Sequence, residues 1–107
     1  MPQPHIFAWD IQADGTLGPR RTLFDASDLA ANYPGMPDGM KVDKDGNIWT
    51  TGPGGVLILS PEGKLLGHIL TGRRTANCAW GDDGSTLYMT ADFHVCRIPT
   101  LTKGAGW

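Results

Sequence analysis

The stretch DGNIWTT at residues 45–51 returns as DGSTLYMT at residues 83–90, and this repetition is the most informative feature of the sequence. Trp49 and Tyr88 are 39 residues apart, and the later run VLIL at residues 56–59 corresponds to VCRI at residues 95–98 with the same offset. A period near 40 residues, with four short strands in each unit, is typical of the blades of a β-propeller. An ordinary antiparallel sandwich, whose hairpins also contain Asp-Gly turns, is the alternative that repetition alone leaves open.

The composition agrees with a chain of short strands and tight turns. The 107 residues include 15 Gly and 8 Pro, and acidic-Gly turn signals stand between short apolar runs. Such signals are typical of β-hairpins. We predict strands near residues 6–11, 20–24, 40–42, 47–51, 56–59, 65–70, 77–80, 86–90 and 95–98, with one helical turn at most, near residues 26–32.

The phase of the repeat predicts an incomplete ring. Residues 1–32 correspond to the outer strands of one blade, residues 33–74 to a complete blade, and residues 75–107 to three strands of the last blade. The fold class is therefore all-β, with antiparallel β-meander blades, of which about two and a quarter are present. Because this number of blades leaves strand edges and apolar faces open, we expect self-association through those edges.

Charge and hydropathy exclude several classes of partner. The net charge is −2 and no basic patch stands out, so we expect no nucleic-acid partner. No apolar run approaches the roughly 18 residues that a membrane-spanning helix needs, so we expect no membrane partner. The first residues lack the pattern of a secretory signal, which predicts a cytoplasmic protein unless a signal lies upstream of this segment.

The segment around the first repeat resembles a known family. PDGMKVDKDGNIW at residues 37–49 is similar to the P-D-G-x-x-x-D-x-x-G-x-x-W motif of the SMP-30/gluconolactonase/LRE family. The family's later segments resemble GGV at 54–56, SPEGKL at 60–65, TANCAWGDD at 75–83 and TLYMT at 86–90. The resemblance is specific in order and spacing, although each piece alone is weak.

The resemblance implies a six-bladed propeller that holds one divalent cation and hydrolyses sugar lactones or related esters. The Asp of the P-D-G motif is a metal ligand and a candidate general base in the family, and this role carries over to Asp38. Ca²⁺ is the first choice of metal, with Zn²⁺ and Mg²⁺ as alternatives. The family's other protein ligands, a Glu and an Asn, have no counterpart in this chain. Trp80 replaces the usual Phe, and Asp82 stands where a second Gly is common, which affects packing and a turn.

The residues beside Asp38 also support a catalytic role for it, independently of the resemblance. Pro37 stiffens the chain before it and Gly39 permits a tight turn after it, so a carboxylate at this strand end could face the centre of a ring. There it could position or deprotonate a water molecule that attacks a lactone. The alternative is that Pro-Asp-Gly is only a turn.

Other polar and aromatic residues carry weaker predictions. Thr51, Asn77 and His94 are candidates to line a substrate pocket at the same end of the blades, although a solvated loop position is the simpler interpretation of His94. The aromatic residues are expected to pack between blades, the two cysteines to be small buried thiols rather than a disulfide or metal site, and the adjacent arginines to be solvated. The aromatic residues are Trp9, Trp49, Trp80 and Tyr88, and the adjacent arginines are Arg73 and Arg74.

Two functions remain open at this point. The first is a metal-dependent lactone or ester hydrolase of which this chain supplies the C-terminal part. The second is a non-catalytic propeller segment that acts as a scaffold or an interaction module.

Overall fold

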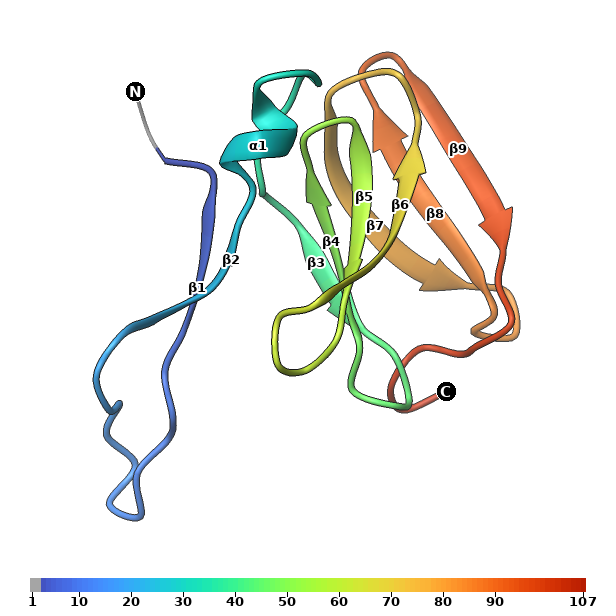
Figure 1. The fold of residues 1–107 in the computed structure, drawn as a ribbon. Helices are drawn as coiled ribbons and strands as arrows, with labels where there is room; N and C mark the ends of the chain where they lie inside the picture. The colour runs from blue at the N-terminus through green and yellow to red at the C-terminus, as the bar shows by residue number, and fades with distance from the viewer. Residues whose placement is uncertain (1–2) are drawn as a thin grey trace.

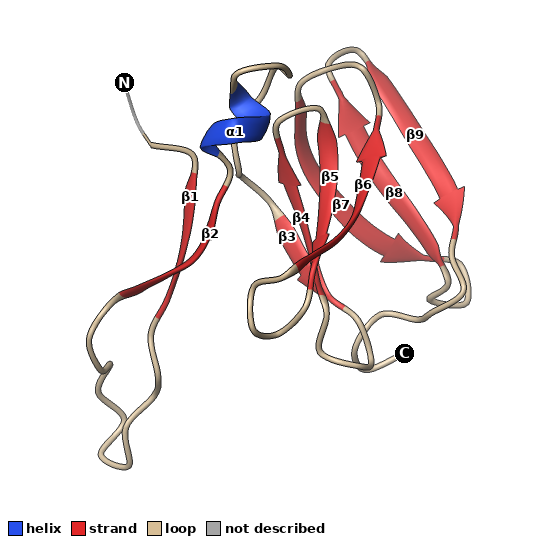
Figure 2. Ribbon diagram, viewed as in Figure 1, coloured by secondary structure: helices blue, strands red, loops and turns tan. Residues whose placement is uncertain are grey.

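The structure, a computed structural model, describes residues 3–107 and is all-β apart from one helical turn (Figures 1 and 2). Its described strands form three antiparallel sheets of two, four and three strands, each in meander order. This arrangement confirms the predicted all-β meander class. The three sheets group the strands as the blade division 1–32, 33–74 and 75–107 proposes, although that division into blades of a complete ring stays a prediction.

The first sheet pairs β1 (His5–Ala8) with β2 (Arg21–Asp25) and projects away from the other two sheets (Figure 1). β1 ends at Ala8, earlier than residue 11 as predicted, and Ile11 makes only an isolated bridge to Leu17. The helical turn α1 (Ser27–Ala30) follows β2 and lies between this hairpin and the second sheet (Figure 2).

The second sheet is a four-stranded meander in which the third strand is buried on both faces. Its strands are β3 (Met40–Val42), β4 (Ile48–Gly52), β5 (Gly55–Leu59) and β6 (Leu65–Leu70). The continuous apolar run of β5 is explained by its place between two layers, since successive side chains of a strand point to opposite faces. Leu57 and Leu59 contribute to one buried cluster, whereas Val56 contributes to the other.

The third sheet contains β7 (Thr75–Gly81), β8 (Thr86–Ala91) and β9 (His94–Pro99), and among the described strands β9 pairs with β8 alone. Its inner face packs against the second sheet, where the rings of Trp49 and Trp80 meet edge to face with centroids 5.1 Å apart. The prediction that these two tryptophans pack between blades is confirmed. Trp9, in contrast, lies beyond the end of β1 and is 42% exposed.

The C-terminal segment ties the second and third sheets together at the end opposite Asp38. Gly104 forms an isolated bridge with Asp43, and the Ala105 N–H donates to the Val42 carbonyl at 3.0 Å. The Gly104 N–H also donates to the carbonyl of Gly84, in the β7–β8 turn, at 3.0 Å. Within residues 3–107, no helix has the length and apolar character to cross a membrane.

Candidate functional site

Asp38 lies in the loop that enters β3, where backbone hydrogen bonds from two neighbouring strands hold the chain. The Asp38 N–H donates to Thr51 Oγ1, on β4, at 3.0 Å. The next residue, Gly39, donates its N–H to the carbonyl of Ala76, on β7, at 3.0 Å and accepts from the Thr51 N–H at 2.9 Å. The carboxylate is therefore carried by a backbone that is fixed to both the second and the third sheet.

Gly39 is required here because β7 passes too close for a side chain. A Cβ at this position would collide with the side-chain amide of Asn77 and would lie 3.0 Å from its Cα. Asn77 follows Asp38 by 39 residues, the offset of the repeat, so the two residues occupy equivalent positions in neighbouring sheets. The close approach places the starts of β3 and β7 side by side.

The Asp38 side chain borders a hollow of about 550 Å³ that we call the Asp38 hollow. Segments associated with all three sheets line it: the entry to β1, the region from α1 to Asp38, and the start of β7. Among residues 3–107, Asp38 is its one carboxylate and Arg74 its one cationic side chain, and the other lining residues are Pro4, Ala30, Tyr33, Pro34, Gly35, Met36, Pro37, Thr75 and Ala76. Asp38 and Arg74 therefore line the same hollow, among residues that are otherwise uncharged.

The loop that forms one wall of this hollow is held by contacts with the second sheet. The Gly54 N–H donates to the Pro34 carbonyl at 2.8 Å, and the ring of Tyr33 meets that of His68 edge to face at 5.2 Å. His68 Nε2 in turn lies 2.8 Å from the Pro53 carbonyl oxygen. Because these contacts join the loop to β6 and to the β4–β5 turn, the wall is part of the packed sheet.

The three weaker pocket candidates are placed differently. Thr51 is fully buried and its hydroxyl oxygen accepts from Asp38, so it supports the carboxylate from within the sheet. Asn77 is adjacent to the site, but its Oδ1 accepts from the Cys78 N–H at 2.9 Å. His94 is exposed at the start of β9, two strands from β7, and does not line the Asp38 hollow. The structure thus brings Asp38, Thr51 and Asn77 together and leaves His94 apart.

Arg73 and Arg74 are both exposed, as predicted, but sequence reasoning missed that Arg74 also lines this hollow. A signal was present: Arg74 stands 39 residues after Gly35, so it is three residues before Asn77 as Gly35 is three residues before Asp38. Applying the repeat offset to the whole entry loop, rather than to the strands alone, would have placed Arg74 beside the site.

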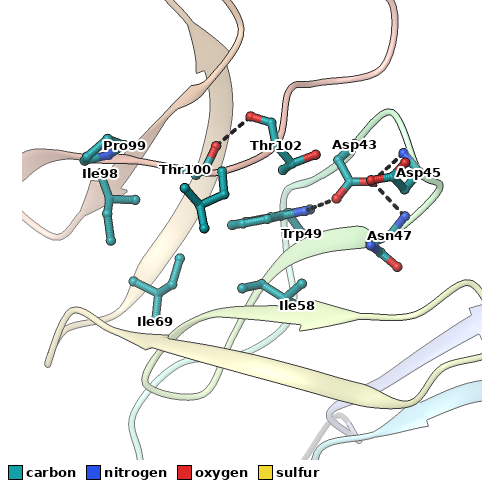
Figure 3. Close-up of a pocket in the computed structure, with 11 residues that line it drawn as sticks. Asp43, Asp45, Asn47, Trp49, Ile58, Ile69, Ile98, Pro99, Thr100 and Thr102 are labelled. Carbon is teal, nitrogen blue, oxygen red and sulfur yellow. Dashed lines mark hydrogen bonds between the residues drawn. The ribbon is translucent and has the colours of Figure 1, made fainter.

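A second hollow, of about 420 Å³, opens between the second and third sheets near β9 (Figure 3). It contains the buried carboxylate of Asp43, whose Oδ2 accepts from Trp49 Nε1 at 2.9 Å. Its Oδ1 accepts from the N–H groups of Asp45 and Asn47 at 2.9 and 3.0 Å. Since the known donors occupy both oxygens, Asp43 acts as a structural residue, and Ile58, Ile69 and Ile98 contribute an apolar part of the lining.

The cysteines are free thiols on the third sheet. Cys78 is buried and donates to the Trp49 carbonyl at 3.5 Å, whereas Cys96 is half-buried. Burial raises the pKa of the Cys78 thiol above its ordinary value of 9.0. Both observations agree with the prediction of packed thiols.

A divalent metal does not fit the described residues on their own. Residues 3–107 contain no group of three or more His, Cys, Asp or Glu side chains that could hold an ion. Of the described residues that line the Asp38 hollow, one is a carboxylate and the only other charged one is a cation. One monodentate or bidentate ligand falls short of the six to eight oxygens that Ca²⁺ takes and the four ligands typical of Zn²⁺.

The comparison with protein families settles the membership of the chain. The model of the SMP-30/Gluconolactonase/LRE-like region matches residues 2–92. The chain belongs to this family. The match covers the two hairpin strands, the four-stranded sheet and all of β7 and β8, which is where the motif residues lie.

Three similar proteins describe the size of the complete family members. A gluconolactonase of Zymomonas mobilis is 37% identical over 106 residues, which cover 94% of this chain and 30% of that protein. An X-ray structure assigned provisionally as a gluconolactonase matches with a TM-score of 0.83 and 31% identity, over 97% of this chain and 34% of the other. A gluconolactonase of Xanthomonas campestris matches with a TM-score of 0.75 and 30% identity, over 89% and 29%. This member of the family therefore spans about a third of the length of these relatives.

Proposed function

We propose that this chain forms part of a lactone hydrolase in which Asp38 is the general base. The observation that carries the proposal is the position of Asp38: a carboxylate on a fixed backbone, at the rim of a hollow where segments of three sheets converge. Relatives called gluconolactonases, similar over nearly the whole chain, support a sugar lactone as the substrate.

The proposed reaction uses water as the nucleophile. Asp38 accepts a proton from a water molecule as the water oxygen bonds to the lactone carbonyl carbon, giving a tetrahedral intermediate. The bond between that carbon and the ring oxygen then breaks, and the ring oxygen takes up a proton to become a hydroxyl group. The product is a hydroxy acid, whose carboxyl group ionises at neutral pH.

A metal cation remains part of the proposal as a prediction about the complete protein. Asp38 would supply one ligand of a Ca²⁺, Zn²⁺ or Mg²⁺ ion, and the other protein ligands would have to come from outside residues 3–107. Bound in such a site, a divalent cation polarises a lactone carbonyl and acidifies bound water.

The second candidate function is a non-catalytic propeller segment, a scaffold or interaction module. The observation that favours it is the lack of a metal-binding cluster among the described residues. A lone exposed carboxylate binds divalent cations only weakly, so the two candidates differ in metal affinity as well as in turnover.

Lactone hydrolysis by the full gene product tests the proposal. Acid release from glucono-lactone should exceed the rate without enzyme, and the excess should disappear with EDTA and return on adding Ca²⁺ or Zn²⁺. No turnover, together with metal binding no tighter than millimolar in a calorimetric titration, would favour the non-catalytic function instead.

We also propose that the 107-residue chain associates with itself through the open edge of β9. Val95 on this strand is 76% exposed, and Phe93 in the preceding turn is 97% exposed. Light scattering should give a mass above that of an 11.5 kDa monomer, and Val95→Lys should shift it toward the monomer because edge lysines oppose strand pairing. A wild-type chain that stays monomeric at millimolar concentration would contradict this proposal.

A further inference from the structure

Arg74 is exposed to solvent and is the cation among the described residues that line the Asp38 hollow. The two ion pairs among residues 3–107 are His5 with Asp25 and Arg21 with Asp10, and Arg74 belongs to neither. No hydrogen bond from its guanidinium to another described residue is present either. A guanidinium that lines a hollow and is not used by the fold is available to a ligand.

The backbone of Arg74 is nevertheless held in place from two sides. Its carbonyl accepts from the Asp92 N–H, in the β8–β9 turn, at 2.9 Å. A Cβ at Gly35 would lie 3.8 Å from the Arg74 Cα and 3.2 Å from the Gly52 carbonyl oxygen, so the entry loops of the second and third sheets lie in contact here. The Arg74 side chain therefore starts from a defined point on the wall that also carries Asp38.

Arg73, which also belongs to neither ion pair, differs from Arg74 in its position relative to the hollow. Thr71 Oγ1 accepts from the Arg73 N–H at 3.2 Å, and the hydroxyls of Thr71 and Thr75 donate to its carbonyl at 3.1 and 3.2 Å. The Arg73 side chain does not line the Asp38 hollow. The chain thus offers two adjacent arginines of equal charge, of which one faces the hollow.

We propose that Arg74 is a substrate-binding residue that recognises the carboxylate of a polyhydroxy acid in the Asp38 hollow. The planar guanidinium has donors that match the two oxygens of a carboxylate, which makes arginine suited to bidentate recognition of this group. The inference rests on the proposed function for the kind of acid involved. The carboxylate can belong to the product, because hydrolysis of a neutral lactone creates one. It can also belong to the substrate, because a lactone of a sugar diacid already carries one.

Binding measurements separate Arg74 from its neighbour without any need for turnover. The full gene product would be titrated calorimetrically with gluconate, with glucarate and with the uncharged polyol sorbitol. We expect Arg74→Ala to weaken binding of at least one of the two acids about 10-fold, a loss of the size expected for a charged hydrogen bond. Arg74→Lys should recover only part of this loss, Arg73→Ala should change binding less than about 2-fold, and sorbitol binding should not respond to either change.

Kinetics then distinguish the two sources of the carboxylate. If Arg74 holds the product, gluconate inhibition of glucono-lactone hydrolysis should weaken in Arg74→Ala while KM for this neutral lactone stays unchanged. If Arg74 holds an acid group of the substrate, KM for a glucarolactone should rise about 10-fold with little change in kcat.

The proposal is overturned if Arg74→Ala binds both acids as the wild type does, or if Arg73→Ala loses as much affinity. Circular dichroism of each variant shows that the fold is intact. Acid binding that depends on Arg74 in a protein without lactonase activity would remove the proposed function and leave the carboxylate site. Lactonase activity, together with acid binding that does not change in Arg74→Ala, would remove the carboxylate site and leave the proposed function.

Discussion

The second and third sheets carry the same acidic–aromatic pair in two different environments. Asp43 and Trp49 in the second sheet correspond to Asp82 and Tyr88 in the third, each 39 residues later. Asp43 is 3% exposed and bonds to the indole N–H at 2.9 Å, whereas Asp82 is exposed and both its oxygens lie 3.0 Å from the Tyr88 hydroxyl. The repeat therefore places the same kind of side-chain contact in both sheets. The contribution of each contact to stability depends on how far it is shielded from water.

The Asp43 carboxylate is shielded from water by a segment that is distant in sequence. The bridge from Gly104 to Asp43, and the bond from the Lys44 N–H to the Lys103 carbonyl at 2.9 Å, lay the C-terminal segment across the turn of the second sheet. We infer that exclusion of water from the Asp43 carboxylate makes the first pair the more important for stability.

The largest difference is expected from the matched substitutions Asp43→Asn and Asp82→Asn. In the buried pair, the amide NH₂ must face either the indole N–H or two backbone N–H groups, so the free energy of unfolding should fall by about 3 kcal/mol. Asp82→Asn should change it by less than about 0.5 kcal/mol, because an exposed amide can still accept from the tyrosine and Asn tolerates the φ of 59° at this position. Urea unfolding of the two variants measures both, and equal losses would mean that the C-terminal segment does not shield Asp43.

Removing the aromatic partner should give a smaller contrast in the same direction. Trp49→Phe leaves the buried Asp43 Oδ2 without its indole donor and reduces the volume of the core, for an expected loss of about 2 kcal/mol. Tyr88→Phe removes only an exposed hydroxyl and should cost less than about 0.5 kcal/mol. Thermal unfolding followed by circular dichroism makes the comparison, and a Tyr88→Phe loss as large as that of Trp49→Phe would contradict it.

The smallest expected effect concerns pH and the thiols of the third sheet. Burial raises the pKa of Cys78 in the folded chain, so its stabilising contribution is complete below the ordinary thiol pKa of 9.0 and is lost as pH rises through the folded value. Stability should therefore fall less steeply above pH 9 in Cys78→Ser than in the wild type. A Cys78→Ser variant whose stability falls as steeply above pH 9 as that of the wild type would contradict this explanation.

The sequence was most informative where the structure is local or periodic. The double-sided burial of β5 accounts for the run VLIL, and the turn signals between apolar runs predicted the strands of the second and third sheets to within about two residues. Asp82, which stands where the family commonly has Gly, adopts a φ of 59°, and this left-handed backbone explains why Gly is favoured there.

Contacts between distant segments could not be predicted in the same way. Nothing in residues 100–107 alone indicates that Gly104 would bridge to Asp43, and the first strand ended at Ala8 because the chain beyond it has no sheet to pack on. The candidate site shows the same limit: the motif identified Asp38, but only the packing of two entry loops brings Arg74 to its hollow.

The most direct test of the account is the rate of lactone hydrolysis by the full gene product carrying Asp38→Asn, beside Asp45→Asn as a control. Asp45 is an exposed turn residue whose backbone, rather than its carboxylate, bonds to Asp43. We predict that kcat for glucono-lactone falls at least about 100-fold in Asp38→Asn and stays within about 2-fold of wild type in Asp45→Asn. An Asp38→Asn protein that hydrolyses the lactone as fast as the wild type would contradict the assignment of Asp38 as the base.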